Sequence, residues 1–224
     1  DQQIQLLSSL YSFQTTMIDS ILGPNSYPKQ IDSFKNKLKL RCGKSYPDVY
    51  KAYSRLFKTI TTNINFTNIN SFENHLTSLR NIITMQQLFT KTIDLRECID
   101  KTSLEIIGLY SMNYKDMTSS YKDVVSTLEV TPNFNSIESG KHFIQGLEEF
   151  KDIQQDYIHN VKRLDSINLR GDSITAACGK KYSDIAEAYR NLHSITNFTP
   201  AYKTHGESFK YTQRLNQFEV LQQY

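Results

Sequence analysis

Two segments of this chain are so alike that they predict an internal repeat. Residues 42–56 (CGKSYPDVYKAYSRL) match residues 178–192 (CGKKYSDIAEAYRNL) at eight of 15 positions, with an offset of 136. Shorter matches extend the similarity in step with the first. They pair residues 4–7 with 144–147, 65–67 with 197–199, and 85–87 with 221–223, at offsets between 132 and 140. Because insertions are tolerated in loops, such small changes of offset are compatible with a tandem duplication of one structural unit.

Apolar residues recur every three or four positions, which predicts helices. Val49, Tyr53, Leu56 and Ile60 have this spacing. Only eight Gly and five Pro occur in 224 residues, which excludes collagen-like and turn-rich all-β chains. We expect helices at residues 3–22, 28–42, 47–62, 94–110 and 113–129, and another that begins near Ser71. The predicted class is all-α.

The repeat suggests a division of the chain into two helical copies. The first copy is expected at residues 1–130 and the second at 139–224, joined by a polar linker at 131–138 that contains Pro132. At an offset of 136 the second copy ends opposite Leu88, so it lacks the last helices of the first. Such a small unit is marginal by itself, and we expect both copies to pack as one bundle-like body.

The three cysteines have two explanations. Cys42 and Cys178 are equivalent in the repeat, whereas Cys98 has no counterpart. A disulfide between Cys42 and Cys98 would close the first copy and leave Cys178 to link two chains as a dimer, which requires an oxidising compartment. Alternatively, all three are buried thiols that pack as small apolar side chains.

Two features predict secretion. Asn65 and Asn197 each begin an Asn-Phe-Thr sequon in a predicted loop, so both are possible glycosylation sites. The chain begins at Asp1 rather than at Met, and we expect that a leader has been removed.

The repeated motif is expected to be structural. Its residues are Cys42, Gly43, Tyr46 and Tyr53 in the first copy, and Cys178, Gly179, Tyr182 and Tyr189 in the second. Each glycine should close a helix in a left-handed conformation, and Tyr53 and Tyr189 lie on predicted core faces. Other tyrosines fall outside the apolar stripes and are expected at a protein-binding surface: Tyr50, Tyr110, Tyr114, Tyr202 and Tyr211.

No arrangement of residues predicts catalysis, a metal or a cofactor. Cys42-Gly-Lys-Ser45 has Leu38 where a phosphate-binding loop needs glycine. The five histidines are scattered, and no Cys-x-x-Cys occurs. The net charge is only +3, and the basic run at residues 35–44 loses most of its charges in the second copy, which argues against nucleic acid. No apolar stretch is long enough to span a membrane.

Five residues resemble the signature of a known family. Cys42, Tyr46 and Cys98, followed by Cys178 and Tyr182, resemble the two cysteine–tyrosine–cysteine motifs of the bicycle proteins, secreted salivary proteins of gall-forming aphids. The closing cysteine of the second motif is missing. The resemblance implies a secreted, non-enzymatic effector that binds a host plant macromolecule.

Two functions follow as hypotheses. The first is a non-enzymatic protein that binds a host protein through its helical surface. The second is a carrier that holds a small apolar ligand in a pocket between helices.

Overall fold

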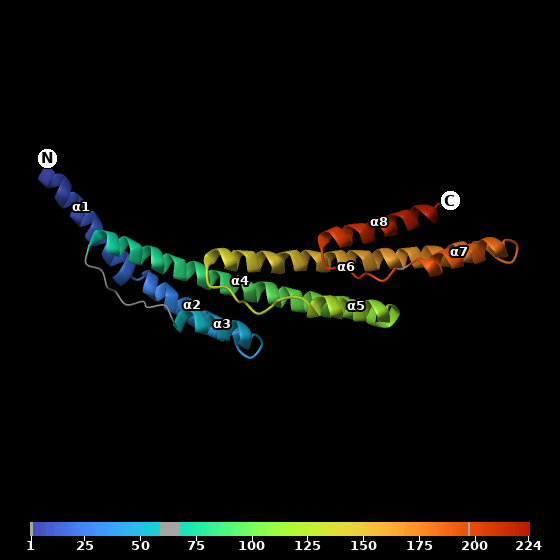
Figure 1. Cartoon of the computed structure of the whole chain (residues 1–224), viewed down its shortest axis with the longest axis horizontal. Coiled ribbons are helices and arrows are strands. Elements are labelled where there is room, and N and C mark those ends of the chain that lie inside the picture. Colours follow the sequence, from blue (N-terminus) through green and yellow to red (C-terminus); the bar gives the residue numbers. More distant parts are fainter. Residues whose placement is uncertain (1, 59–67, 197) are drawn as a thin grey trace. The chain divides into compact units, whose positions relative to one another are not determined.

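The computed structural model describes residues 2–58, 68–196 and 198–224. In those ranges every regular element is a helix and none is a strand, so the all-α prediction is confirmed (Figure 1). The elements are α1 (Gln2–Met17), the π-helix η1 (Ile18–Leu22), α2 (Tyr27–Cys42), α3 (Pro47–Lys58), α4 (Ile69–Asn113), α5 (Lys115–Ser126), α6 (Ile137–Cys178), α7 (Ser183–Ile195) and α8 (His205–Leu221).

Two of the helices are much longer than predicted. The expected helix near Ser71 and the one at residues 94–110 are both parts of α4, which has 45 residues. Residues 69–107 contain neither glycine nor proline, so no local signal ends the helix between them. Helix α6 has 42 residues and likewise contains no proline.

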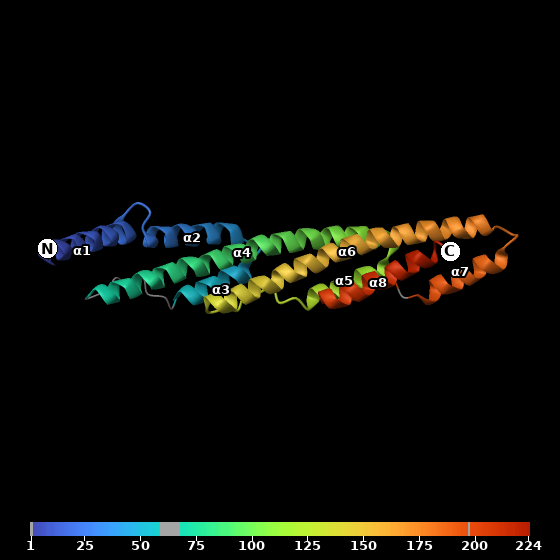
Figure 2. The ribbon, with the colours of Figure 1, turned by 90° about the horizontal axis from the view of Figure 1, so that it is seen from above.

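The ends of other helices follow the sequence. Pro47 opens α3, and Thr204 caps α8 by accepting a hydrogen bond from the backbone N–H of Glu207. Gly43 and Gly179 have φ angles of 42° and 52°, which confirms the predicted left-handed glycines. Each lies in the turn that reverses the chain, between α2 and α3 or between α6 and α7 (Figures 1 and 2).

The compact units differ from the predicted copies. The first unit comprises Asp1–Leu95 and Val130–Gln145, and the second comprises Arg96–Glu129 and Gly146–Tyr224. The expected boundaries were 1–130 and 139–224. The division falls within α4 and α6, because these uninterrupted helices carry residues of both units.

The segment predicted as a linker, residues 131–138, is packed into the first unit. Phe134 is buried with its ring centroid 4.6 Å from that of Phe89. The Thr131 hydroxyl donates a 3.0 Å hydrogen bond to Asp48 Oδ2. Polar composition suggested a linker, but one aromatic side chain anchors the segment to the core.

Tyrosines dominate the core of the second unit. The prediction that Tyr110, Tyr202 and Tyr211 are exposed is wrong, because all three are buried there with Tyr121 and Tyr157. Tyr50 and Tyr114 are half-buried. Burial is possible because the hydroxyls find acceptors: Tyr110 donates to the Tyr157 carbonyl oxygen and Tyr157 to that of Tyr202, both at 3.2 Å.

All three cysteines lie in the described ranges, and none forms a disulfide. The predicted bridge between Cys42 and Cys98 is therefore corrected. Cys42 is buried among apolar side chains of the first unit, where it packs as a small apolar residue, and Cys98 and Cys178 are partly buried.

Two further predictions concern glycosylation and membranes. Asn65 and Asn197, the possible glycosylation sites, lie outside the described residues. Among the residues that are described, no helix combines the length and the hydropathy needed to cross a bilayer.

Candidate functional site

A buried glutamine makes the same pair of hydrogen bonds three times in the chain. The side-chain Nε2 of Gln86 donates to the Ile31 carbonyl oxygen and to Tyr53 Oη, both at 2.9 Å. Gln154 donates likewise to Ile99 at 3.0 Å and to Tyr121 at 2.7 Å, and Gln222 to Ile167 and Tyr189, both at 2.8 Å. The three glutamines are 68 residues apart, and so are the three isoleucines and the three tyrosines.

The orientation of each amide is fixed by its partner. A backbone carbonyl oxygen only accepts hydrogen bonds, so the amide nitrogen, not the oxygen, must face Ile31, Ile99 or Ile167. The other atom, Oε1, is buried in all three glutamines and has no hydrogen-bond partner among the described residues. The arrangement ties three helices together at equivalent points.

Beside the first of these glutamines, α2 and α3 form an apolar groove that is filled. Its walls include Leu38, Cys42, Tyr46, Val49 and Tyr53, and all five are buried. The rings that fill it are Phe89 of α4 and Phe134 of the segment before α6, with Ile137 and Phe143 packed alongside. This groove is complete within the first unit.

The second unit contains an equivalent filled groove. Here Ile106, Tyr110, Met117 and Tyr121 stand 68 residues after Leu38, Cys42, Val49 and Tyr53, and they belong to the buried core. Tyr157 and Tyr202 fill this groove with their rings stacked at a centroid distance of 4.3 Å. They stand 68 residues after Phe89 and Phe134, so the same positions supply the filling aromatic pair.

The third equivalent position is an open groove at the ends of α6, α7 and α8. Its volume is about 650 Å³, and its lining includes Ile174, Cys178, Tyr182, Ile185, Tyr189 and Leu221. We call these six residues the end groove. Tyr182 is 47% exposed, whereas its counterpart Tyr46 is 7% exposed. Ile185 is 54% exposed, whereas its counterpart Val49 is fully buried.

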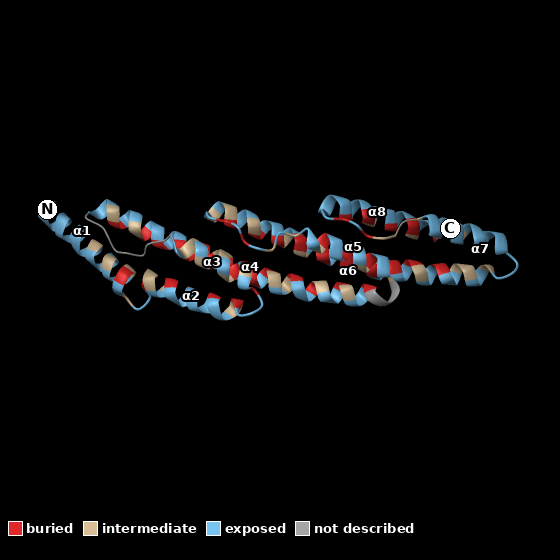
Figure 3. Ribbon diagram, turned by 60° about the horizontal axis from the view of Figure 1, so that its bottom comes forward, coloured by how far each residue is buried: buried red, intermediate tan, exposed pale blue. Residues whose placement is uncertain are grey.

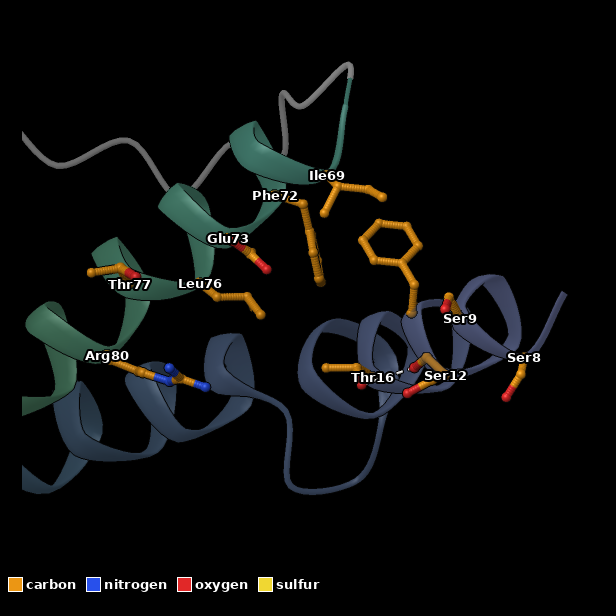
Figure 4. Close-up of a pocket in the computed structure, with 11 residues that line it drawn as sticks. Ser8, Ser9, Ser12, Thr16, Ile69, Phe72, Glu73, Leu76, Thr77 and Arg80 are labelled. Atoms are coloured by element: carbon orange, nitrogen blue, oxygen red, sulfur yellow. Dashed lines mark hydrogen bonds between the residues drawn. The ribbon is translucent and has the colours of Figure 1, made fainter. Parts of the chain in front are cut away.

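A second cleft, of about 710 Å³, lies between α1 and the start of α4 in the first unit (Figure 4). Hydroxyl groups of α1 line one side of it, but those of Ser9 and Thr16 donate to carbonyl oxygens of their own helix. Arg80 on the other side donates to Tyr27 Oη at 2.9 Å. The polar groups with bonds in this cleft are thus engaged locally rather than aimed at a common point.

A chain of polar side chains in the second unit links Asp165, Tyr114, Asn168 and His193. Tyr114 Oη donates to Asp165 at 2.7 Å and accepts from Asn168 at 2.9 Å, and His193 lies 3.1 Å from Asn168 Oδ1. Burial, and then the hydrogen bond and charge of Asp165, raise the pKa of Tyr114 to about 12. This direction keeps the phenol protonated near neutral pH, whereas a tyrosine that acts as a base needs a lowered pKa.

The structure separates the repeated motif into a buried and an exposed set. Cys42, Tyr46 and Tyr53 belong to the core of the first unit, whereas Cys178, Tyr182 and Tyr189 line the end groove. Sequence reasoning missed Ile185, Leu221 and Gln222. Their signal was available as the 68-residue spacing of equivalent residues. In ranges 2–58, 68–196 and 198–224, no three His, Cys, Asp or Glu side chains gather in a way that would hold a metal ion.

Exposed apolar side chains elsewhere are spread along single helices. Helix α1 has no buried residue, as its colouring in Figure 3 shows, and Ile4, Leu7 and Leu10 on it are exposed. The end groove differs because its apolar residues come from three helices and enclose a concave space. Comparison with known proteins adds nothing to this geometry, since no family model, no curated protein and no solved structure matches the chain.

Proposed function

We infer that the chain contains three copies of one helical repeat rather than two. The offset of 136 between the matching segments is twice the 68-residue interval of the buried glutamines. Identical residues occupy seven positions in all three copies: Ile31, Ile99 and Ile167; Tyr46, Tyr114 and Tyr182; Asp48, Asp116 and Asp184; Tyr53, Tyr121 and Tyr189; Leu79, Leu147 and Leu215; Gln86, Gln154 and Gln222; Gln87, Gln155 and Gln223.

We propose that the protein is a non-enzymatic binding protein whose end groove docks a partner protein. One observation carries the proposal: residues that are buried in the first two copies line an open groove in the third. Covering apolar side chains is favourable by about 25 cal/mol per Å² of area removed from water. Half-exposed Tyr182 and Ile185, at the centre of such a concave surface, have the character of interface anchors.

The resemblance to the bicycle proteins supplies the rest of the proposal. It makes the chain a secreted effector and its partner a protein of a host plant. A dimer linked through Cys178, which lies in the end groove, stays a prediction for the same protein.

The proposal is tested by affinity capture from plant extract with the wild-type chain and two variants. Ile185→Asp places a charge in the end groove at an exposed site. Leu169→Asp is the matched control, because Leu169 is 71% exposed on α6, outside the groove, and its counterpart one copy earlier is Lys101. We expect a captured protein that Ile185→Asp loses and Leu169→Asp retains. Loss from neither variant, or from both, contradicts the proposal, and so does substrate turnover at enzyme-like rates.

The same groove also favours a second candidate, a carrier of a small apolar ligand. Its volume of about 650 Å³ falls in the range of small-molecule sites. However, such sites cover most of their ligand, whereas Tyr182 and Ile185 leave this groove open on one side. Native mass spectrometry separates the two functions: a retained adduct that Ile185→Asp loses supports a carrier, and a bare polypeptide mass supports a protein partner.

A further inference from the structure

The end groove has two filled counterparts in this same chain, and these show what kind of segment fits it. Phe134 fills the first and Tyr202 the second, and both are buried. Each aromatic is the fourth residue of a Thr-Pro-x-aromatic sequence, at residues 131–134 and 199–202. Each precedes a helix, α6 or α8, by only a few residues.

The first filled groove matches the end groove almost residue for residue. Cys42, Tyr46, Ala52, Tyr53 and Leu56 of the first are identical to their counterparts in the third. These counterparts are Cys178, Tyr182, Ala188, Tyr189 and Leu192, and all of them line the end groove. The two surfaces therefore offer nearly the same shape and chemistry.

Polar groups around the groove match as well. In the first unit the Thr131 hydroxyl donates to Asp48, which sets the register of the filling segment. The counterpart of Asp48 beside the end groove is Asp184, which is exposed. A threonine three residues before the aromatic would reach an acceptor of the same kind.

Resting on the proposed function, we propose that the end groove binds a segment of the partner protein that presents an aromatic side chain just before a helix, as residues 131–145 do in the first unit. The anchor is a Phe or Tyr ring seated over Tyr182 and Ile185. A proline two residues before the ring fixes the extended approach, and a threonine before that proline donates to Asp184.

A peptide of residues 131–145 with Phe134→Trp tests this proposal against the whole 224-residue chain. The chain contains no tryptophan, so tryptophan emission reports the peptide alone. We expect a saturable blue shift as the indole leaves water. Ile185→Asp in the chain should weaken binding at least about tenfold, as should Phe134→Ala in a labelled peptide followed by anisotropy. The control Leu169→Asp should bind as the wild type does.

Three results would overturn the proposal. The first is no saturable binding, and the second is binding that Ile185→Asp leaves unchanged. The third is concentration-dependent self-association of the chain that Ile185→Asp abolishes, because the occupant is then a second copy. If the peptide fails while Ile185→Asp still loses a partner from plant extract, only this inference falls. If both experiments fail, the proposed function falls with it.

Discussion

The amide nitrogen of Gln154 lies 2.7 Å from the hydroxyl oxygen of Tyr121, inside the core of the second unit. The same nitrogen lies 3.0 Å from the Ile99 carbonyl oxygen, so one buried amide joins α4, α5 and α6. Gln86 and Gln222 repeat this junction. A buried polar group is stabilising only when it is bonded, and these contacts therefore fix how each set of three helices packs.

Gln154→Ala should lower the free energy of unfolding by about 3 kcal/mol, because it leaves a buried carbonyl oxygen without its side-chain donor and creates a cavity. Urea denaturation followed by circular dichroism measures the change. Gln155→Ala is the matched control, since the adjacent Gln155 is exposed, and it should change stability by less than about 0.5 kcal/mol. Equal effects from the two variants would contradict a structural role for the amide.

Gly171→Ala should destabilise the chain although alanine is the better helix former. A Cβ at position 171 would lie 2.4 Å from Tyr189 Oη, the atom that accepts a bond from Gln222. Displacing that ring should cost about 1–3 kcal/mol. Gly146→Ala, in the same helix with open space around it, should instead stabilise by about 0.5–1 kcal/mol. Thermal melts of both variants check the opposite signs.

The three cysteines should differ in their reactivity toward a thiol reagent under native conditions. Cys98 and Cys178 are partly buried and should react first, whereas Cys42 is buried and should react only as the chain unfolds. Without reductant, the denatured chain should release three equivalents of thiol in a colorimetric assay. One equivalent would mean that two cysteines are bridged, contrary to the structure.

Alkaline pH should unfold the second unit. Burial raises the pKa of Tyr110, Tyr157, Tyr202 and Tyr211 above the ordinary value of 10.0. Above pH 10 the unfolded chain loses these protons while the folded chain keeps them, so the free energy of unfolding falls as pH rises. Each such tyrosine contributes about 1.4 kcal/mol per pH unit in that window, and nothing below about pH 9.

Denaturation at pH 8, 10 and 11 measures this slope, with phenolate absorbance as a second signal. Tyr110→Phe should make the slope between pH 10 and 11 shallower by about 1.4 kcal/mol per pH unit. Tyr11→Phe, at an exposed position, is the matched control and should leave it unchanged. A slope that does not depend on Tyr110 would contradict the burial of its hydroxyl.

Local sequence could not reveal the middle copy of the repeat. Its residues 110–112 are Tyr-Ser-Met, where the first and third copies have Cys-Gly-Lys. The strongest match therefore paired the first copy with the third, and a period of 68 was seen as one of 136. The contacts of Gln154 with Ile99 and Tyr121 show the missing member, because a glutamine can be recognised as buried and bonded only in three dimensions.

The sequence by itself determined the helical class, the start of α3 at Pro47 and the positive-φ turns at Gly43 and Gly179. These features depend on periodicity and backbone preference, which act over a few residues. Tertiary structure decided which tyrosines are buried and which groove stays open. A tyrosine can lie in the core or at the surface, and the choice depends on an acceptor far along the chain. For Tyr110 that acceptor is the carbonyl of Tyr157, and for the groove it is the presence or absence of an aromatic such as Phe134.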